Sequence, residues 1–359
     1  MIASTNKCVL VVDGNWLLQS RMFVMGDCFA VGQDDYTNAQ RKLQMLLSQS
    51  LIGTINQLRC VTDVVLVADG GSWRKELERP VVYQIEYKGN RHASEDKNWD
   101  AIWSAFNDWL DRCRKIGMTV SQSRGAEGDD WIAYWTNYFY SRSIDSIIWS
   151  TDHDLWQLIA HKDDGTFVAA YEKKMGVVMD RRFDTSDVSL FEQLVLMPED
   201  STNMIWLKNN IEQKTYIEPK SVTMSKVIIG DAGDNVLSIV TRPYVDKNGK
   251  TIIRKVTSTD WNKCQEELHI DYNNFLEKKT AIVDYLLTLK RYADYDREAM
   301  LTMFDFNIKL VTLSMDIIPQ SLFENAEFKS DFDINNIKNN FMLLCKDDDT
   351  TAYVEELPF

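Results

Sequence analysis

The stretch that most constrains this chain runs from Gly125 to Leu155, where two groups of acidic residues flank a helical pattern and an apolar run. The acids are Glu127, Asp129 and Asp130 in the first group and Asp152 and Asp154 in the second. The apolar run, Ile147-Ile148-Trp149, predicts a buried strand that ends just before the second group. Asp152 and Asp154 can point the same way, since strand residues two apart share a face. Carboxylates this close repel one another unless a cation holds them, which favours a divalent metal site.

Helix capping is an alternative explanation for the first group, because acids are favourable in the first turn of a helix. Capping does not explain why acids recur at the ends of other strands. KCVLVVD (residues 7–13) and VVLVAD (residues 64–69) both predict apolar strands, and each ends in an aspartate. Apolar strands that alternate with helices indicate a mostly parallel sheet with helices on both faces. Ligands bind outside the carboxyl ends of such strands, so we expect Asp13, Asp69 and Asp152 to line one acidic pocket.

The remaining patterns predict two domains and a tail. Helices are expected over residues 16–25, 38–59 and 99–115, and further strands over 118–120, 167–171 and 177–179. From Ser186 onward helical patterns dominate, including 188–197 and 280–289. We therefore predict an α/β domain over 1–185, a helical domain over 186–325 and an acidic tail over 326–359. Asp231 and Asp234, three residues apart after Gly230, would lie on one side of a helical turn, although a surface turn would look similar.

The net charge of −14 argues against nucleic acid as a partner, since duplex binding needs a basic face. The charge is patterned, however. Nine acids are candidates for one metal cluster, whose cations would offset them: Asp13, Asp69, Glu127, Asp129, Asp130, Asp152, Asp154, Asp231 and Asp234. Segment 242–255 is basic, with Arg242, Lys247, Lys250, Arg254 and Lys255 against the single acid Asp246. That segment is the candidate nucleic-acid contact.

The cysteines and histidines bear on the cellular compartment and on the kind of metal that the chain binds. Six scattered cysteines without a CxxC pair indicate reduced residues of a cytoplasmic protein. Only four histidines are present, which argues against a zinc enzyme. Oxygen-only ligands favour Mg²⁺, with Mn²⁺ able to substitute. The sequence has no apolar run long enough to span a membrane and no signal-like N-terminus.

Five segments of the chain, in order, resemble motifs of the 5′-nuclease superfamily of flap endonucleases and 5′→3′ exonucleases. They are VVDGNWLL, VADGGSWRKELERPVVYQIEYKGNR, GAEGDDWIAYW, STDHDLWQLI and IGDAGDNV. The resemblance covers residues 7–325 and is strongest to the ribonuclease H group of T-even-type bacteriophages. It implies a PIN-like α/β nuclease domain with a helical arch over about 72–116. It also implies a monomeric two-metal enzyme that removes RNA primers and adjoining DNA from 5′ ends or flaps, on RNA–DNA and DNA duplexes, during phage replication in the host cytoplasm.

The resemblance also assigns roles to individual residues. It implies that the first metal is surrounded by Asp13, Asp69, Asp129 and Asp152, with Glu127 close by. It implies that the second is held by Asp154, Asp231 and Asp234, with Asp130 in the outer shell. Lys88 and Arg91 of YKGNR match basic residues at the base of the arch, and Arg74 is a weaker match for the same phosphate-handling role.

The chain departs from the family pattern at three places. Gly128 replaces the usual alanine and His153 the usual lysine, and neither change removes a ligand. The glycine-rich helix-three-turn-helix that normally follows GDxxDN is missing, so the basic side chains of 242–255 are expected to grip the duplex instead. The acidic tail is a candidate contact for a single-strand-binding protein or another replication protein. A solvated tail without a partner is the simpler alternative.

Two other classes of protein fit the sequence less well. A nucleotide-binding switch should carry a phosphate-cradling GxxxxGK[ST] loop, and the sequence has none. A non-catalytic DNA-junction-binding protein of the same fold should have lost some of the acids, whereas all nine are present. A metal-dependent phosphodiester hydrolase is the reading that the residues favour.

Overall fold

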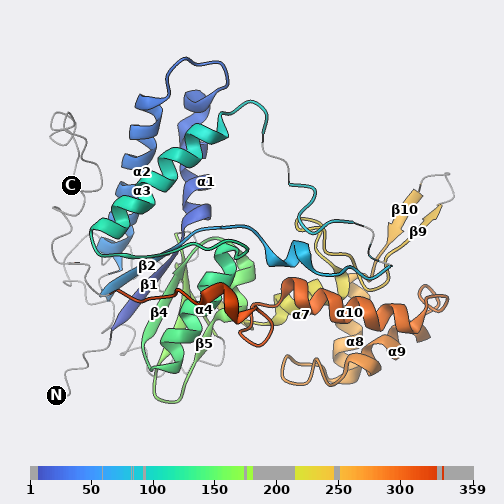
Figure 1. The fold of residues 1–359 in the computed structure, drawn as a ribbon. Coiled ribbons are helices and arrows are strands. Elements are labelled where there is room, and N and C mark those ends of the chain that lie inside the picture. The colour runs from blue at the N-terminus through green and yellow to red at the C-terminus, as the bar shows by residue number, and fades with distance from the viewer. Residues whose placement is uncertain are drawn as a thin grey trace. The chain divides into compact units, whose positions relative to one another are not determined.

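The computed structural model describes residues 7–58, 60–81, 83, 85–91, 94–173, 176–180, 215–245, 251–329 and 334 (Figure 1). The chain forms two compact units. The α/β unit comprises Met1–Gly71, Ala93–Ile217 and Pro319–Phe359, and the helical unit comprises Ser72–His92 and Glu218–Ile318. Within the described part of the chain, no helix is both long and apolar enough to cross a membrane.

A mostly parallel sheet forms the centre of the α/β unit, as the sequence predicts. Its strands are β1 (Cys8–Asp13), β2 (Asp63–Val67), β3 (Thr119–Ser121), β4 (Asp145–Trp149), β6 (Phe167–Glu172), β7 (Gly176–Asp180) and β8 (Thr215–Ile217), with β5 (Ala160–His161) beside β6. The order is β3-β2-β1-β4-β6-β7-β8. The pairs of β1 with β2 and with β4 are parallel, whereas β6 and β7 are antiparallel. β1, β2 and β4 are buried along their whole length, which explains their unbroken apolar sequences.

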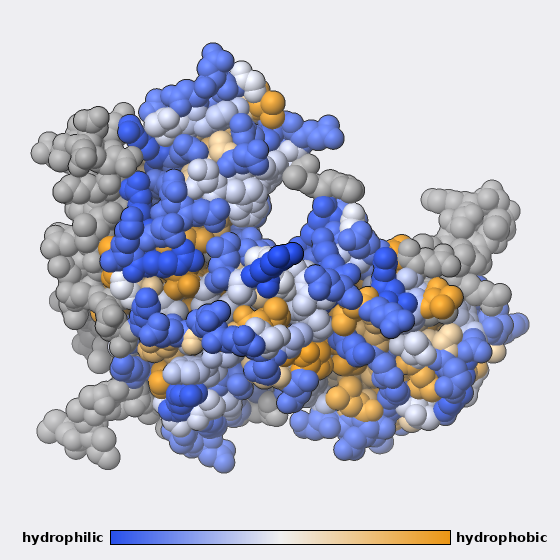
Figure 2. All heavy atoms as spheres, viewed as in Figure 1, coloured by the Kyte–Doolittle hydropathy of each residue, from blue (hydrophilic) through white to orange (hydrophobic). Residues whose placement is uncertain are grey.

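Helices cover both faces of this sheet. α1 (Gly14–Met25), α2 (Thr37–Gln57) and α3 (Trp99–Lys115) share one core with Cys8, Leu10 and Val12, the alternate residues of β1. α4 (Gly128–Ser141) contacts β1, β2 and β4. On the face drawn in Figure 2, hydrophilic residues cover most of the layer formed by α1, α2 and α3. These observations confirm the predicted fold class.

The helical unit has its own core. It contains α7 (Ser221–Ile229), α8 (Ser258–Leu268), α9 (Lys279–Thr288) and α10 (Arg297–Val311), with an antiparallel hairpin of β9 (Arg242–Val245) and β10 (Thr251–Arg254). The short helix η2 (Trp73–Glu76) opens the other segment of this unit. Tyr83 from that segment packs edge-on against Phe306, with ring centroids 4.7 Å apart. Val227, Trp261, Phe275 and Phe304 belong to the same buried cluster.

The units are divided at different positions from the boundaries predicted above. Residues 72–92 pack with the helical unit because Tyr83 and Tyr87 are buried in its core. The division falls between Ile217 and Glu218 rather than at residue 185, and the helix predicted over 188–197 lies outside the described residues. α3, the second half of the predicted arch, buries Phe106 and Trp109 in the α/β core.

The end of the predicted helical domain and the start of the predicted tail also pack on the α/β unit. Phe323, in η5 (Gln320–Phe323), stacks on Tyr134 of α4 with ring centroids 4.6 Å apart. Phe328 meets Phe139 edge-on at 5.0 Å, and the Lys329 N–H donates to Thr119 Oγ1 at 2.8 Å. The chain up to Lys329 is therefore part of this fold. Most of the remaining tail lies outside the described residues.

Candidate metal centre

Asp13 lies at the centre of the acidic edge of the α/β unit. It is the last residue of β1 and the N-cap of α1, where its Oδ1 accepts from the Trp16 N–H at 2.9 Å. Its Oδ2 accepts from the Ser150 hydroxyl at 2.8 Å. Ser150 also accepts from the Asp152 N–H at 3.1 Å, so this serine ties Asp13 to the loop after β4.

The electrostatics of Asp13 show that the predicted carboxylates converge. Burial raises the pKa of Asp13 to about 6, the bonds from Trp16 and Ser150 oppose that rise, and the nearby carboxylates of Asp69 and Asp152 add to it. The side chain is only 7% exposed, so water does little to relieve this repulsion. A divalent cation among these carboxylates would relieve it, and their oxygens are the donors that hard cations prefer. The residues present therefore fit a divalent metal.

Asp69 is held in place from both sides. Asn15 Nδ2 donates to Asp69 Oδ2 at 2.8 Å, and Asn15 Oδ1 accepts from the Asp69 N–H at 2.9 Å. The Gly128 N–H donates to Asp69 Oδ1 at 2.5 Å. A Cβ at position 128 would lie 3.1 Å from that oxygen, so glycine in place of the family's usual alanine permits a close approach of α4.

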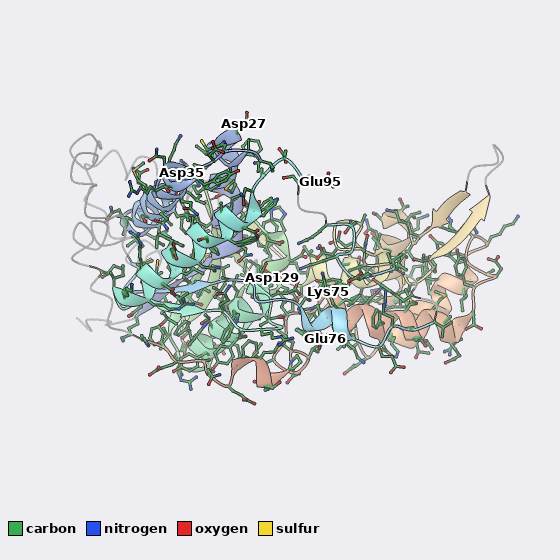
Figure 3. All side chains as sticks on the ribbon, turned by 45° about the horizontal axis from the view of Figure 1, so that its top comes forward. Asp27, Asp35, Lys75, Glu76, Glu95 and Asp129 are labelled. Atoms are coloured by element: carbon green, nitrogen blue, oxygen red, sulfur yellow. The ribbon has the colours of Figure 1, made fainter. Side chains whose placement is uncertain are left out.

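In the first acidic group, two residues cap α4 and the third is a half-buried acid outside the capping box. Glu127 is the N-cap of α4 in a capping box, and its N–H donates to Asp130 Oδ2 at 3.0 Å. Asp130 is completely buried, so the capping alternative explains this residue. Asp129 lies half-buried on the first turn of α4, where Figure 3 labels it. Asp129 is therefore the member of this group best placed to bind a ligand.

The second acidic group opens the short helix η3 (His153–Leu158). Asp152 is its N-cap, with Oδ1 accepting from the Asp154 N–H at 2.9 Å. The His153 ring stacks on Trp156 with centroids 3.9 Å apart, and its Nε2 lies 3.6 Å from Glu172 Oε2. The imidazole is thus engaged by neighbours of its own unit.

Asp231 and Asp234 lie in the helical unit, in a tight loop rather than a helical turn. Asp231 and Val236 exchange backbone hydrogen bonds of 2.8 and 2.7 Å, which closes the loop directly after α7. Gly230 enters this loop with φ of 86°, and a Cβ there would meet the Val236 carbonyl at 2.5 Å. Of the two alternatives that the spacing left open, the structure shows the surface turn, because backbone pairing across the loop sets its geometry.

Each carboxylate of this loop has a cation of its own unit beside it. Lys226 Nζ lies 2.5 Å from Asp231 Oδ2. Burial alone would raise the pKa of Asp231, but the Lys226 ammonium outweighs it and holds the pKa below its usual range. Asp234 forms an ion pair with Arg91, and Lys88 Nζ lies 3.9 Å from its Oδ2.

The segment YKGNR is fixed to the same loop by its backbone. The Lys88 N–H donates to the Asp234 carbonyl at 2.9 Å, and Asn90 Nδ2 donates to the Ala232 carbonyl at 3.0 Å. Lys88 has a left-handed backbone (φ 55°) in this turn. Two segments 143 positions apart in the sequence are thus joined within the helical unit.

The other residues predicted to bind phosphate differ in their burial. Arg74 is buried in η2, with its guanidinium 4.8 Å from the Trp73 ring. Arg254 is half-buried and Lys255 exposed. Arg242 lies in β9, and Lys247 and Lys250 lie outside the described residues.

Sequence reasoning missed three residues of these sites: Asn15, Ser150 and Lys226. Asn15 and Ser150 adjoin acidic motifs, in DGN and STDHD, so their position was an available signal. Lys226 lies five residues before its partner, on α7, and could have been found only by placing that helix.

Comparison with known proteins agrees with this geometry. Residues 8–189 match the family model described as 5′-3′ exonuclease, N-terminal resolvase-like domain. A 5′-3′ exonuclease of Mycoplasmopsis pulmonis (strain UAB CTIP) is 27% identical over 260 residues, which is 72% of this chain and 69% of that protein. The parallel sheet with an acidic carboxyl edge is thus the nuclease domain of a phosphodiester hydrolase. The chain belongs to the 5′-3′ exonuclease family, within the 5′-nuclease superfamily.

Solved structures show the same fold at lower sequence identity. The 5′-exonuclease of bacteriophage T5 with bound zinc aligns with a TM-score of 0.52 and 15% identity, covering 95% of this chain and 100% of that one. A flap endonuclease of bacteriophage T5 in complex with DNA and metal ions gives the same TM-score, identity and coverage. The fold of the chain is therefore that of the T5 enzymes.

Proposed function

We propose that the chain is a metal-dependent 5′→3′ exonuclease and flap endonuclease with ribonuclease H activity. The observation that carries the proposal is the convergence of Asp13, Asp69 and Asp152 at the carboxyl edge of the sheet, where burial, with the two neighbouring carboxylates adding to it, raises the pKa of Asp13. A structural sheet edge would be destabilised by such an arrangement without a bound cation. Membership of the 5′-3′ exonuclease family supports the reaction class.

The metal in this proposal is Mg²⁺, with Mn²⁺ able to substitute, because every assigned donor is a carboxylate oxygen. The ligands proposed in the α/β unit are Asp13, Asp69, Glu127, Asp129, Asp152 and Asp154, with Asp130 behind them. By motif resemblance, Asp231 and Asp234 of the helical unit contribute as well. Two divalent cations bound by these residues would supply activation of a water near neutral pH and stabilisation of the leaving oxygen.

The chain's own residues have separate roles in the proposal. The bonds from Trp16 and Ser150 hold Asp13 in one orientation, so that its carboxylate is preorganised before any ligand binds. Lys88 and Arg91 are proposed to bind the scissile phosphate and to stabilise its transition-state charge. Arg74, being buried, is proposed only to support that segment.

The proposed substrates are DNA and RNA–DNA duplexes with a 5′ end or a 5′ flap. Resemblance to the T-even ribonuclease H group supports RNA primer removal in phage replication, by a monomer in the host cytoplasm. The T5 flap endonuclease in complex with DNA and metal ions supports DNA as one substrate. A single-strand-binding protein is the proposed partner of the acidic tail.

Matched substrates labelled at either end test the function. The expected result is release of short products from the 5′ end of flap DNA and of an RNA–DNA hybrid, with Mg²⁺ and not with EDTA. A matched Asp129→Asn protein should bind these substrates without cutting them. Degradation from the 3′ end, or activity that survives EDTA, contradicts the proposal. Binding of junctions without cleavage in any metal would favour the non-catalytic DNA-junction-binding protein instead.

A further inference from the structure

The positive charge of the chain is concentrated in the helical unit. That unit carries 19 lysines and arginines against 18 aspartates and glutamates, whereas the α/β unit carries 21 against 36. A polyanion is therefore repelled far less by the helical unit. If the chain grips nucleic acid without the family's usual motif, the contacts should be sought there.

Four cations gather where two separate segments of this unit meet. Arg254 is the last residue of β10, Lys255 follows it and leads into α8, and Lys290 and Arg291 follow α9. We call these four residues the basic corner. Lys255, Lys290 and Arg291 are exposed, and Arg254 is half-buried. Lys290 and Arg291 lie outside the basic segment 242–255 that the sequence singled out.

Hydrogen bonds hold the two segments side by side. Arg254 Nη1 donates to the Arg291 carbonyl at 2.7 Å. Tyr292, which is completely buried, donates through its hydroxyl to Asp260 Oδ2 at 2.7 Å and accepts from the Thr257 N–H at 3.2 Å. The cations thus sit on a packed framework, which lowers the entropy lost when they bind a ligand.

Among the described residues of this corner, the carboxylate of Asp260 is already engaged. Asp260 Oδ2 accepts from Tyr292 and Thr257 and lies 3.1 Å from Arg291 Nη1. The next acids after Tyr292 are Asp294 and Asp296, and Asp296 caps α10 through the Ala299 N–H at 2.7 Å. The N-terminus of α8, capped by Thr257, adds its partial positive charge to the corner.

We propose that the basic corner binds the phosphate backbone of duplex nucleic acid, with Lys290 and Arg291 as contacts. This inference rests on the proposed function, since it supplies the duplex grip that the missing helix-three-turn-helix leaves open. Cations from two rigid segments suit a double-stranded backbone, which presents phosphates at fixed spacing. Because the proposed contacts are charges that bind phosphate, binding should be independent of sequence and sensitive to salt.

The test measures duplex affinity across a salt series, in an Asp129→Asn background so that the substrate stays intact. The double variant Lys290→Gln, Arg291→Gln should lower the slope of log affinity against log salt by about 1.8, or about 0.9 per lost phosphate contact. The same relation predicts a loss of affinity of up to about 60-fold at roughly 0.1 M salt. Lys290→Gln alone, a change at an exposed position, should give half of the slope change.

Two controls separate charge from position. Lys309→Gln removes an exposed cation from α10, near Asn307, which is bonded to α7, and should leave the slope unchanged. Tyr292→Phe keeps every charge but removes the hydroxyl that joins the segments, so it should weaken binding without changing the slope. Thermal unfolding of each variant checks that the fold is retained.

The outcomes distinguish this inference from the proposed function. If the wild-type chain cuts 5′ ends with Mg²⁺ but the double variant binds duplex like Lys309→Gln, the corner is not the contact. If binding to a single strand of equal length falls as much as binding to duplex, the assignment to duplex is overturned. If the wild-type chain cuts nothing, the proposed function fails whatever the corner does.

Discussion

Asp13→Asn should make the fold more stable in the absence of metal while removing its activity. Asparagine can keep the cap, because its Oδ1 can still accept from the Trp16 N–H. Its amide can donate to Ser150 Oγ in place of the bond that the carboxylate accepts. The substitution therefore removes a charge and changes little else in the packing of α1 against the sheet.

The size of the effect follows from the pKa of Asp13. Burial, with Asp69 and Asp152 nearby, raises that pKa from 3.8 to about 6. Because the folded pKa is the higher one, the native state binds the proton more tightly, and stability falls as pH rises from about 4 through about 6. Above that window the ionised carboxylate costs about 3 kcal/mol, at 1.36 kcal/mol per pKa unit. Asp13→Asn should regain up to that amount near neutral pH.

Urea unfolding with EDTA and with Mg²⁺ measures this, and Asp145→Asn is the matched control. Asp145 is buried at the start of β4, where burial and nearby Asp164 raise its pKa to about 6 as well. It pairs with Cys8, at the opposite end of β1 from Asp13. Both variants should be stabilised in EDTA. With Mg²⁺ the advantage of Asp13→Asn should shrink, since ligand binding stabilises the wild type, whereas that of Asp145→Asn should persist. The reasoning would be refuted if Asp13→Asn gave no gain in stability in EDTA, or if its gain in stability were the same with Mg²⁺ as with EDTA.

Three further predictions follow from the site and the tail. Asp129→Asn and Asp152→Asn should reduce single-turnover cleavage at least about 10²-fold while leaving duplex affinity equal or tighter, since each removes negative charge from the surface that meets phosphate; near-normal cleavage by either would show that the metal assignment is wrong. Lys88→Ala should slow cleavage steeply at saturating substrate, and metal titration followed by stability should show that Mg²⁺ still binds. A chain ending at Asn325 should unfold at a lower temperature than one ending at Asn336, because it loses Phe328 from its contact with Phe139; equal melting temperatures would count against this role.

The sequence predicted the α/β unit well because its signals are local. β1, β2 and β4 are unbroken apolar runs, and the acids that follow them converge because parallel neighbours share a carboxyl edge. Asp130 could not be separated from Asp129 by sequence, since a capping box and a ligand pair use the same residue types.

What the sequence missed depends on contacts between distant segments. Residues 72–92 join the helical unit through Tyr83, whose hydroxyl donates to the Asn235 carbonyl at 2.6 Å, 152 positions away. No periodicity in a single window carries that information. The loop at Asp231 is likewise set by its pairing with Val236, which the spacing of its acids left open.

The two sets of carboxylates should differ in their binding free energy for a cation. Asp13 stands among Asp69 and Asp152, and its pKa is raised by burial and by these two carboxylates, against the opposing bonds from Trp16 and Ser150. Asp231 and Asp234 already face Lys226, Lys88 and Arg91, and the pKa of Asp231 is lowered accordingly. A cation that takes a carboxylate of the second set must displace an existing ion pair, whereas one that joins the first set relieves a penalty. We therefore expect the α/β unit to supply the tighter metal affinity. Lys88 and Arg91 would turn from Asp234 to the substrate phosphate only when that carboxylate is otherwise engaged, so that metal and substrate strengthen each other's binding.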